Sequence, residues 1–230
     1  MRVAVLFSGG KDSTFATYIA HRQGWQVQYL VTMQPPSSES WMFHHPCTEL
    51  TKLQAEAMGI RQILQKTAGK KEEELQDLLS AIKPVVERDE IDAIVSGAVA
   101  SNYQKDRVEA LAKDLGIKHI ALLWHKDPEQ LLREELQNGF EIIFTAVAAE
   151  GFDKSWLGRK LDAQAVNELK ALNEKYGTHI CGEGGEYETF VTDCPMFKRK
   201  IQLVDVGKIW DGKTESGYII CRDAKLINKD

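Results

Sequence analysis

The residues with the clearest chemical potential are the six from Ser8 to Ser13, which read Ser-Gly-Gly-Lys-Asp-Ser and follow a short apolar run. Two adjacent glycines have no Cβ atoms, so a phosphate can approach the backbone closely. The first turn of a helix adds unpaired N–H groups and the positive end of its dipole. The segment therefore predicts a nucleotide-binding loop made of Ser8, Gly9, Gly10, Lys11, Asp12 and Ser13.

Asp12 needs a separate role because a carboxylate does not favour a bare phosphate. It could cap the following helix or hold Mg²⁺ beside bound ATP, and we expect both ATP and Mg²⁺ as cofactors. Two common nucleotide motifs do not match this segment. G-x-x-x-x-G-K-[ST] fails because Val5 stands at its first glycine, and G-x-G-x-x-G fails because the spaced glycines are missing.

The elements around this loop predict an α/β fold. Apolar strand-like runs alternate with helical stretches over about the first 123 residues, with strands expected at 3–7, 27–33, 60–65, 91–95 and 117–123 and helices at 12–22, 48–58, 70–88 and 106–115. This alternation indicates a doubly wound, five-stranded parallel sheet. Ligands bind such sheets beyond the carboxyl ends of the strands, so we expect chemistry after Phe7, Met33, Val95 and Leu123.

The rest of the chain has a mixed α+β pattern. We expect helices at 129–137 and 161–176, and strands at 140–148, 188–192, 201–206 and 218–221. The expected organisation is an ATP-binding domain over 1–124 and a smaller substrate-binding domain over 125–230.

Ser8–Ser13 resembles the SGGxDS loop, or PP-loop, of the N-type ATP pyrophosphatases. In that superfamily the loop grips the pyrophosphate of ATP while a substrate carbonyl oxygen attacks the α-phosphate. A nucleophile then displaces AMP from the adenylated substrate. The resemblance implies the HUP-like fold, whose five-stranded parallel sheet agrees with the strand pattern.

Three further segments make the chain similar to the diphthine–ammonia ligase family: Gln54–Gly59, the region from Ser96 to Glu109, and Gly182–Thr189, which reads GEGGEYET. That family uses ATP and ammonium to convert diphthine, the modified histidine of elongation factor two, into diphthamide. The resemblance spans the chain from Ser8 to about Phe197 and implies elongation factor two as the protein substrate. Because the chain is short, we expect the archaeal-type form without extra C-terminal domains.

The resemblance also implies the site residues. Ser96 and Gly97 join the nucleotide-binding loop, and the catalytic residues expected are Lys11, Asp12, Glu183 and Glu186. The residues expected to bind the acceptor are Tyr103, Gln104, Arg107, Gly184, Gly185, Glu186, Tyr187 and Glu188. Diphthine carries a quaternary ammonium, which favours carboxylates and aromatic faces. The acids could instead orient ammonium or bind a metal, or line an ordinary solvated turn.

Other branches of the superfamily fit less well. We do not expect a glutaminase domain with an N-terminal cysteine, because the chain begins Met1-Arg2, and ammonia would then come from ammonium or a separate protein. The four cysteines form no C-x-x-C pair of the kind that some transfer-RNA thiolases use. We expect free thiols and no zinc. The segment His44–Cys47 favours a loop over the nucleotide rather than a metal site, because adjacent histidines on an extended chain point to opposite faces.

Composition bounds the remaining possibilities. A net charge of −5 and a pI near 5.8 argue against a nucleic-acid coating protein, so RNA is not the expected partner. No stretch reaches the ~18 apolar residues of a membrane span. We expect a cytoplasmic enzyme with no membrane partner, and the sequence leaves a homo-oligomer open. Two alternatives also stay open: another acceptor, such as a transfer-RNA base or a small carboxylate, and a nucleotide-binding sensor without turnover.

Overall fold

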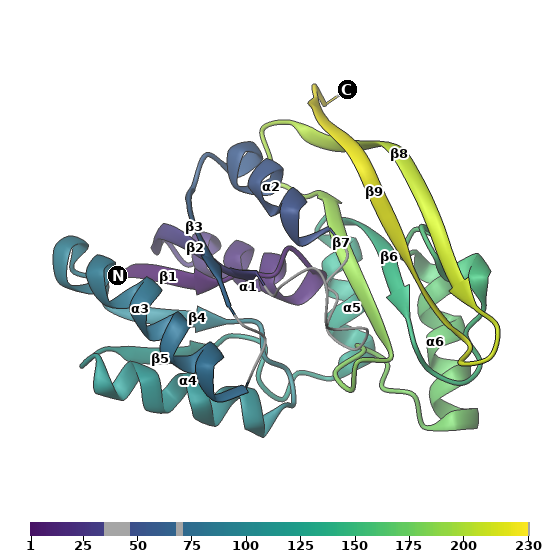
Figure 1. Cartoon of the computed structure of the whole chain (residues 1–230), viewed down its shortest axis with the longest axis horizontal. Helices are drawn as coiled ribbons and strands as arrows, with labels where there is room; N and C mark the ends of the chain where they lie inside the picture. Colours follow the sequence, from purple (N-terminus) through teal and green to yellow (C-terminus); the bar gives the residue numbers. More distant parts are fainter. Residues whose placement is uncertain (35–46, 68–70, 230) are drawn as a thin grey trace. The chain divides into compact units, whose positions relative to one another are not determined.

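The computed structural model of the chain describes residues 1–34, 47–67 and 71–229 (Figure 1). Of the segment His44–Cys47, which we predicted to lie over the nucleotide, His44, His45 and Pro46 lie outside these residues. By the density of internal contacts, the described chain forms two compact units. The first holds most of the chain up to His125, and the second holds Lys126 onward together with Gly9–Lys11 and the helix Thr51–Met58.

The first unit contains the predicted five-stranded parallel sheet, so the fold class is confirmed. Its strands are β1 (Arg2–Leu6), β2 (Gln26–Gln34), β3 (Arg61–Lys66), β4 (Ala93–Ser96) and β5 (Lys118–Ala121), in the order β3-β2-β1-β4-β5 (Figure 1). β1 pairs with β2 on one side and with β4 on the other. The chain passes from β1 to β2 and β3 on one side of β1 and then to β4 and β5 on the other side. Ligands of such sheets bind where the strand order reverses, so we expect a ligand at the carboxyl ends of β1 and β4.

The described part of the first unit also contains three α-helices, two of which pack on one face of the sheet through an apolar core. They are α1 (Lys11–Arg22), α3 (Lys71–Asp89) and α4 (Asn102–Asp114). On one face, Ala4, Tyr29 and Ile94 of the strands pack with side chains of α3 and α4, among them Ile82, Val85 and Leu111. Helix α3 runs on through Pro84 to Asp89, so this proline does not end the helix.

Helix α4 begins four residues earlier than the predicted start at 106. Ser101 caps it, because its hydroxyl oxygen accepts a hydrogen bond from the N–H of Gln104 at 3.3 Å. The polar segment before 106 lacks the apolar spacing that predicts a helix, so the cap sets the boundary here. As a result Tyr103, Gln104 and Arg107 all lie in its first two turns.

The second unit contains a four-stranded antiparallel sheet in the order β7-β6-β9-β8, and its strands are β6 (Glu141–Val147), β7 (Tyr187–Asp193), β8 (Lys200–Asp211) and β9 (Ser216–Ile227). Its helices are α2 (Thr51–Met58), preceded by the short η1 (Thr48–Leu50), α5 (Pro128–Gln137) and α6 (Ala163–Tyr176), with a single turn η2 (Lys154–Trp156). Phe144 and Phe190 are fully buried in this unit.

The β8–β9 hairpin is longer than the sequence pattern indicated. Each strand has 12 residues, whereas the apolar runs cover only 201–206 and 218–221. The remaining residues pair through the backbone ladder while many side chains, such as Lys208 and Arg222, face solvent. Apolar runs therefore do not mark the ends of these strands.

Candidate active site

The two serines of the PP-loop contact each other in the first unit. The backbone N–H of Ser8 donates to Ser13 Oγ at 3.3 Å, and the two hydroxyl oxygens lie 3.2 Å apart. Asp12 lies in the first turn of α1, and one of its carboxylate oxygens is buried. These contacts bring both hydroxyls and the Asp12 carboxylate to the amino end of a 12-residue helix, where anions bind readily.

The carboxyl end of β4 passes directly beside this first turn. A Cβ atom on Gly97 would lie 2.7 Å from the carbonyl carbon of Asp12 and 2.8 Å from the backbone nitrogen of Ser13. Only glycine fits at that separation without moving the backbone. The fold therefore brings Ser96 and Gly97, both predicted from the sequence, to the same point as Asp12 and Ser13.

A histidine not singled out from the sequence contacts Ser96. His119 on β5 places Nε2 2.8 Å from Ser96 Oγ, and the Ser96 side chain is buried. Burial lowers the pKa of His119 below its ordinary 6.5, and Lys105 lowers it further while Glu109 opposes them. The imidazole is thus neutral at neutral pH and can hold the Ser96 hydroxyl in one direction.

The predicted acceptor residues of the first unit lie on α4. The Arg107 guanidinium hydrogen-bonds the Tyr103 hydroxyl, and its central carbon lies 4.7 Å from the centre of the Tyr103 ring. Tyr103 is 52% exposed, and Gln104 is exposed beside it. An aromatic ring and a cation are therefore presented together on the first turns of this helix.

The middle of the PP-loop is built into the second unit. The N–H of Val191 donates to the carbonyl of Gly9 at 3.1 Å, and the N–H of Lys11 donates to Thr189 Oγ1 at 3.1 Å. The side-chain amide of Gln54, which is fully buried, donates to the Gly9 and Val191 carbonyls. Strand β7 and helix α2 thus hold this part of the loop.

Lys11 is a buried cation, with a side chain only 2% exposed. Its Nζ donates to the carbonyl of Cys181 at 2.7 Å and lies 5.5 Å from the centre of the Tyr187 ring. Tyr187 is itself buried, and its hydroxyl donates to the carbonyl of Ile180 at 2.6 Å. Of the two predicted tyrosines, Tyr103 is the exposed one, while the Tyr187 ring packs beside the Lys11 ammonium.

The glycine-rich turn before β7 is held by side-chain acceptors. The two carboxylate oxygens of Glu186 accept the N–H groups of His179 and Gly184, each at 2.8 Å. His179 Nδ1 accepts the N–H groups of Cys181 and Glu183 at 3.2 and 3.4 Å. The turn therefore has one defined conformation, with Gly184 and Gly185 exposed and Glu183, Glu186 and Glu188 half-buried.

Sequence reasoning passed over several of these side chains: Gln54, His119, His179, Cys181 and Thr189. Two of them, Gln54 and Thr189, lie inside segments already singled out for their similarity to the family. They are neutral, so charge gave no reason to choose them. Their roles come from backbone partners far away in the sequence, which a single sequence does not reveal.

A metal ion at this site would have few ligands from the described residues. Among the described residues, no group of three or more His, Cys, Asp or Glu side chains could enclose an ion. None of the four cysteines forms a disulfide. Burial raises the pKa of Cys47 and Cys194 to about 12, so these two thiols stay protonated at neutral pH. A Mg²⁺ ion bound here would have to rely on Asp12 and on oxygens of the nucleotide.

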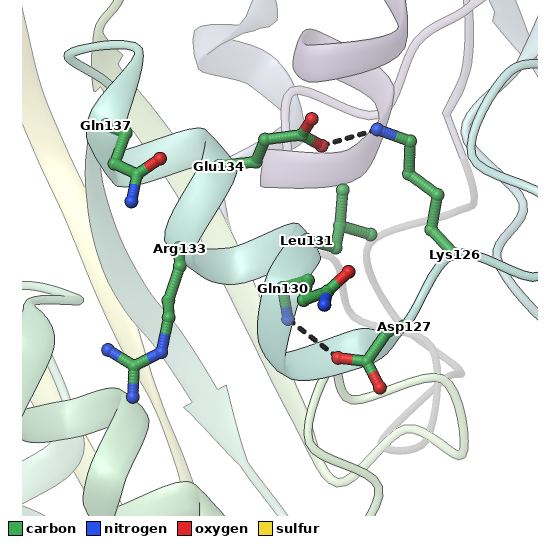
Figure 2. Close-up of a pocket in the computed structure, with 7 residues that line it drawn as sticks. All are labelled: Lys126, Asp127, Gln130, Leu131, Arg133, Glu134 and Gln137. Atoms are coloured by element: carbon green, nitrogen blue, oxygen red, sulfur yellow. Dashed lines mark hydrogen bonds and ion pairs between the residues drawn. The ribbon is translucent and has the colours of Figure 1, made fainter.

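A cavity of about 360 Å³ lies along α5 in the second unit (Figure 2). Figure 2 shows Lys126 paired with Glu134, and Asp127 accepting the N–H of Gln130 at the helix start. Its lining residues are Lys126, Asp127, Gln130, Leu131, Arg133, Glu134 and Gln137. None of the predicted site residues lines it. Of its charged lining residues, Lys126 pairs with Glu134, and Arg133 pairs with Glu129 on the same helix.

Comparison with known proteins gives one consistent result. The sequence profile of the diphthamide synthase N-terminal domain matches residues 1–119, and that of the diphthamide synthase C-terminal domain matches residues 127–227. The chain is 38% identical to the diphthine–ammonia ligase of Homo sapiens, covering 91% of this chain and 85% of that protein. It is 36% identical to the diphthine–ammonia ligase of Schizosaccharomyces pombe, covering 95% of this chain and 39% of that protein. No helix of the described residues is long and apolar enough to cross a membrane.

Proposed function

The chain belongs to the diphthamide synthase family, and we propose that it is an ATP-dependent amide ligase, which converts diphthine, ammonia and ATP to diphthamide, AMP and pyrophosphate. One observation carries the proposal at the level of the site. The PP-loop residues Gly9–Lys11 are hydrogen-bonded to strand β7, which continues the Gly182–Thr189 segment, inside one compact unit. The loop suited to a triphosphate and the acid-rich segment suited to the acceptor are therefore parts of one assembly.

The chemistry proceeds in two displacements. A carboxylate oxygen of diphthine attacks the α-phosphorus of ATP, forming a C–O–P linkage as the bond between the α-phosphorus and its bridging oxygen breaks. Pyrophosphate leaves with that oxygen. The nitrogen of ammonia then attacks the activated carbonyl carbon, AMP leaves, and the nitrogen loses a proton as the amide forms.

The residues contribute by positioning and charge rather than by a covalent intermediate. Ser8, Gly10 and Ser13 bind phosphate oxygens at the amino end of α1, and Lys11 stabilises the negative charge that develops during the first displacement. Asp12 would hold Mg²⁺, which supplies charge neutralisation on the phosphates when bound. One buried carboxylate oxygen fits this ion, which takes one or two protein carboxylates and leaves its other positions to phosphates and water.

The acceptor is the diphthine side chain of elongation factor two. Tyr103 on α4 offers an exposed aromatic side chain, and the Arg107 cation stacked on its ring suits the negative charge of the activated phosphate. Glu183 and Glu188 offer carboxylates for the trimethylammonium group. We assign ATP binding to residues 1–124 and acceptor binding to residues 125–230, with both functions in the cytoplasm. Because α4 belongs to the first of these domains, the acceptor also draws on residues outside 125–230.

The test is release of AMP and pyrophosphate from ATP in the presence of ammonium and diphthine-bearing elongation factor two. Release that requires both ammonium and the modified factor supports the ligase. Release that is stimulated by a transfer RNA or a small carboxylate instead assigns the same PP-loop chemistry to another acceptor. Bound ATP that stays intact with every acceptor contradicts an enzymatic role.

A further inference from the structure

The Gln54 side chain makes two hydrogen bonds with one amide group. Its Nε2 donates to the carbonyl of Gly9 at 2.8 Å and to the carbonyl of Val191 at 2.8 Å, and the residue is fully buried. Chemistry fixes the orientation of this amide, because both neighbours are acceptors and only the NH₂ end can serve them. The amide therefore fastens the PP-loop backbone to strand β7.

Strand β7 makes two further contacts with the same loop. The N–H of Val191 donates to the Gly9 carbonyl, and Thr189 Oγ1 accepts the N–H of Lys11. Thr189 and Val191 are two residues apart on one strand, as are Gly9 and Lys11 on the loop. The loop thus runs along β7 with its ends fixed at Gly9 by Gln54 and at Lys11 by Thr189.

These contacts define the direction of the groups that meet ATP. Gly9 has φ of +82°, and a Cβ atom there would lie 2.4 Å from Gln54 Oε1, so the loop accepts only glycine at this position. The Lys11 ammonium is held separately, by the Cys181 carbonyl and the Tyr187 ring. A glycine-rich loop has many accessible backbone conformations. Its hydrogen bonds to Gln54, Thr189 and Val191 therefore restrict it to one of them.

We propose that Gln54 and Thr189 are positioning residues for the ATP-dependent step. They hold the backbone of Gly9–Lys11 in the conformation that receives the triphosphate, and the inference rests on the proposed function only in naming ATP as the ligand. It gives the last residue of the GEGGEYET segment a role in nucleotide binding, separate from any role of its acids in acceptor binding.

The experiment compares four variants by equilibrium binding of ATP and of α,β-methylene-ATP, each with MgCl₂. The methylene analogue cannot be split between its α- and β-phosphorus atoms. Gln54→Met keeps the volume but removes both hydrogen bonds, and Thr189→Val removes the acceptor for the Lys11 N–H. Thr189→Ser keeps that acceptor. Thr192→Val is the matched control, because Thr192 lies on the same strand and donates instead to the Glu141 carbonyl.

We expect Thr189→Val to raise the Kd of the analogue about tenfold, the effect of losing one well-formed hydrogen bond, and Gln54→Met, which loses two, to raise it by at least as much. Thr189→Ser and Thr192→Val should bind like wild type, and in the turnover assay the KM for ATP should follow the same order. Serine keeps the hydroxyl acceptor and valine removes it. A difference in ATP affinity between these two variants therefore reports the hydrogen bond to the Lys11 N–H rather than a general loss of stability.

Binding of the analogue by folded Thr189→Val as tight as that of wild type overturns the proposal. So does an equal loss of affinity in Thr189→Ser and Thr192→Val. If Gln54→Met does not fold, the three threonine variants decide alone. Because analogue binding needs no acceptor, the pattern is readable even if diphthine is not the substrate, so failure of the proposed function is distinguished from failure of this inference.

Discussion

At the scale of single residues, burial distinguishes side chains that look equivalent in the sequence. Lys11 is 2% exposed and is held by a carbonyl and an aromatic ring, whereas Lys170 on α6 is an exposed ion-pair partner of Glu129. A buried ammonium has few solvent competitors, so its interaction with developing charge is stronger than in water. This environment suits Lys11 to stabilising charge on the α-phosphate.

Replacing Lys11 tests that role. Lys11→Ala should lower the rate of pyrophosphate release by on the order of 10²–10³, as expected for the loss of one charge-stabilising donor. The measurement is steady-state release of pyrophosphate at saturating ATP, with Lys170→Ala as the control for removing a lysine. A Lys11→Ala rate close to that of wild type would exclude the lysine from the chemical step.

Glu186 acts on the backbone of the glycine-rich turn rather than on the PP-loop. Its two oxygens accept the N–H groups of His179 and Gly184, so the carboxylate fixes the turn that also carries Glu183. Glu186→Ala should leave ATP binding near the wild-type value and abolish amide formation, because the acceptor side of the site loses its shape. ATP titration and product mass analysis measure the two effects, with exposed Glu174→Ala as control. An equal loss of ATP affinity would instead place Glu186 at the nucleotide.

The sequence suggested charged residues for the candidate site but not the neutral side chains that contact the same loop. Lys11 and Asp12 follow from a loop whose residue types match phosphate chemistry. Gln54 and Thr189 act through backbone groups about 45 and 180 residues away in the chain, respectively, and nothing in their own type marks this. Such roles depend on tertiary contacts, which local pattern does not carry.

At the scale of elements, β4 ends beside the first turn of α1 and brings Ser96 to it. The Ser96–His119 contact joins the two strands by side chains as well as by their ladder. His119 faces Glu109 and Lys105 of α4, and burial is the largest cause of its lowered pKa. The protonation state of His119 therefore affects its hydrogen bond with Ser96, the last residue of β4.

The sign of the resulting pH dependence follows from this shift. In the unfolded chain the imidazole takes up a proton as the pH falls through about 6.5, whereas the folded chain resists until a lower pH. Above about pH 6.5 the imidazole is neutral in both states, so its titration does not change the free energy of unfolding. Below that pH the unfolded chain binds the proton more readily, so the free energy of unfolding falls. We expect the Tm of wild type to fall more steeply below pH 6.5 than that of His119→Gln. Thermal unfolding across pH 5 to 8 measures this, with exposed His21→Gln as control, and parallel curves for wild type and His119→Gln would refute it.

Elements were predicted well where hydrophobic spacing is strong. The five strands of the parallel sheet lie within a few residues of their expected positions, because buried parallel strands form short, dense apolar runs. The start of α4 was misplaced because a Ser101 cap, not apolar spacing, sets it. The β8–β9 hairpin was underestimated because many of its outer residues, such as Lys208 and Arg222, are polar and interrupt the apolar runs.

At the scale of the whole molecule, the chain supplies two separate arrangements for one reaction. The first unit provides the parallel sheet whose carboxyl edge carries Ser8, Ser13 and Ser96, and the second provides the antiparallel sheet that holds Gly9–Lys11 and the GEGGEYET turn. The PP-loop is covalently shared by both. Gly9–Lys11 and the GEGGEYET segment therefore belong to the same compact unit.

The decisive measurement is the mass of elongation factor two before and after incubation with this protein, ATP, Mg²⁺ and ammonium. The proposed reaction replaces the hydroxyl of one carboxyl group by NH₂, so the factor should lose the corresponding mass while AMP and pyrophosphate accumulate in equal amounts. Use of ¹⁵N-ammonium should raise the product mass by the isotope difference. Pyrophosphate release without any change in the mass of the factor would contradict diphthine as the acceptor.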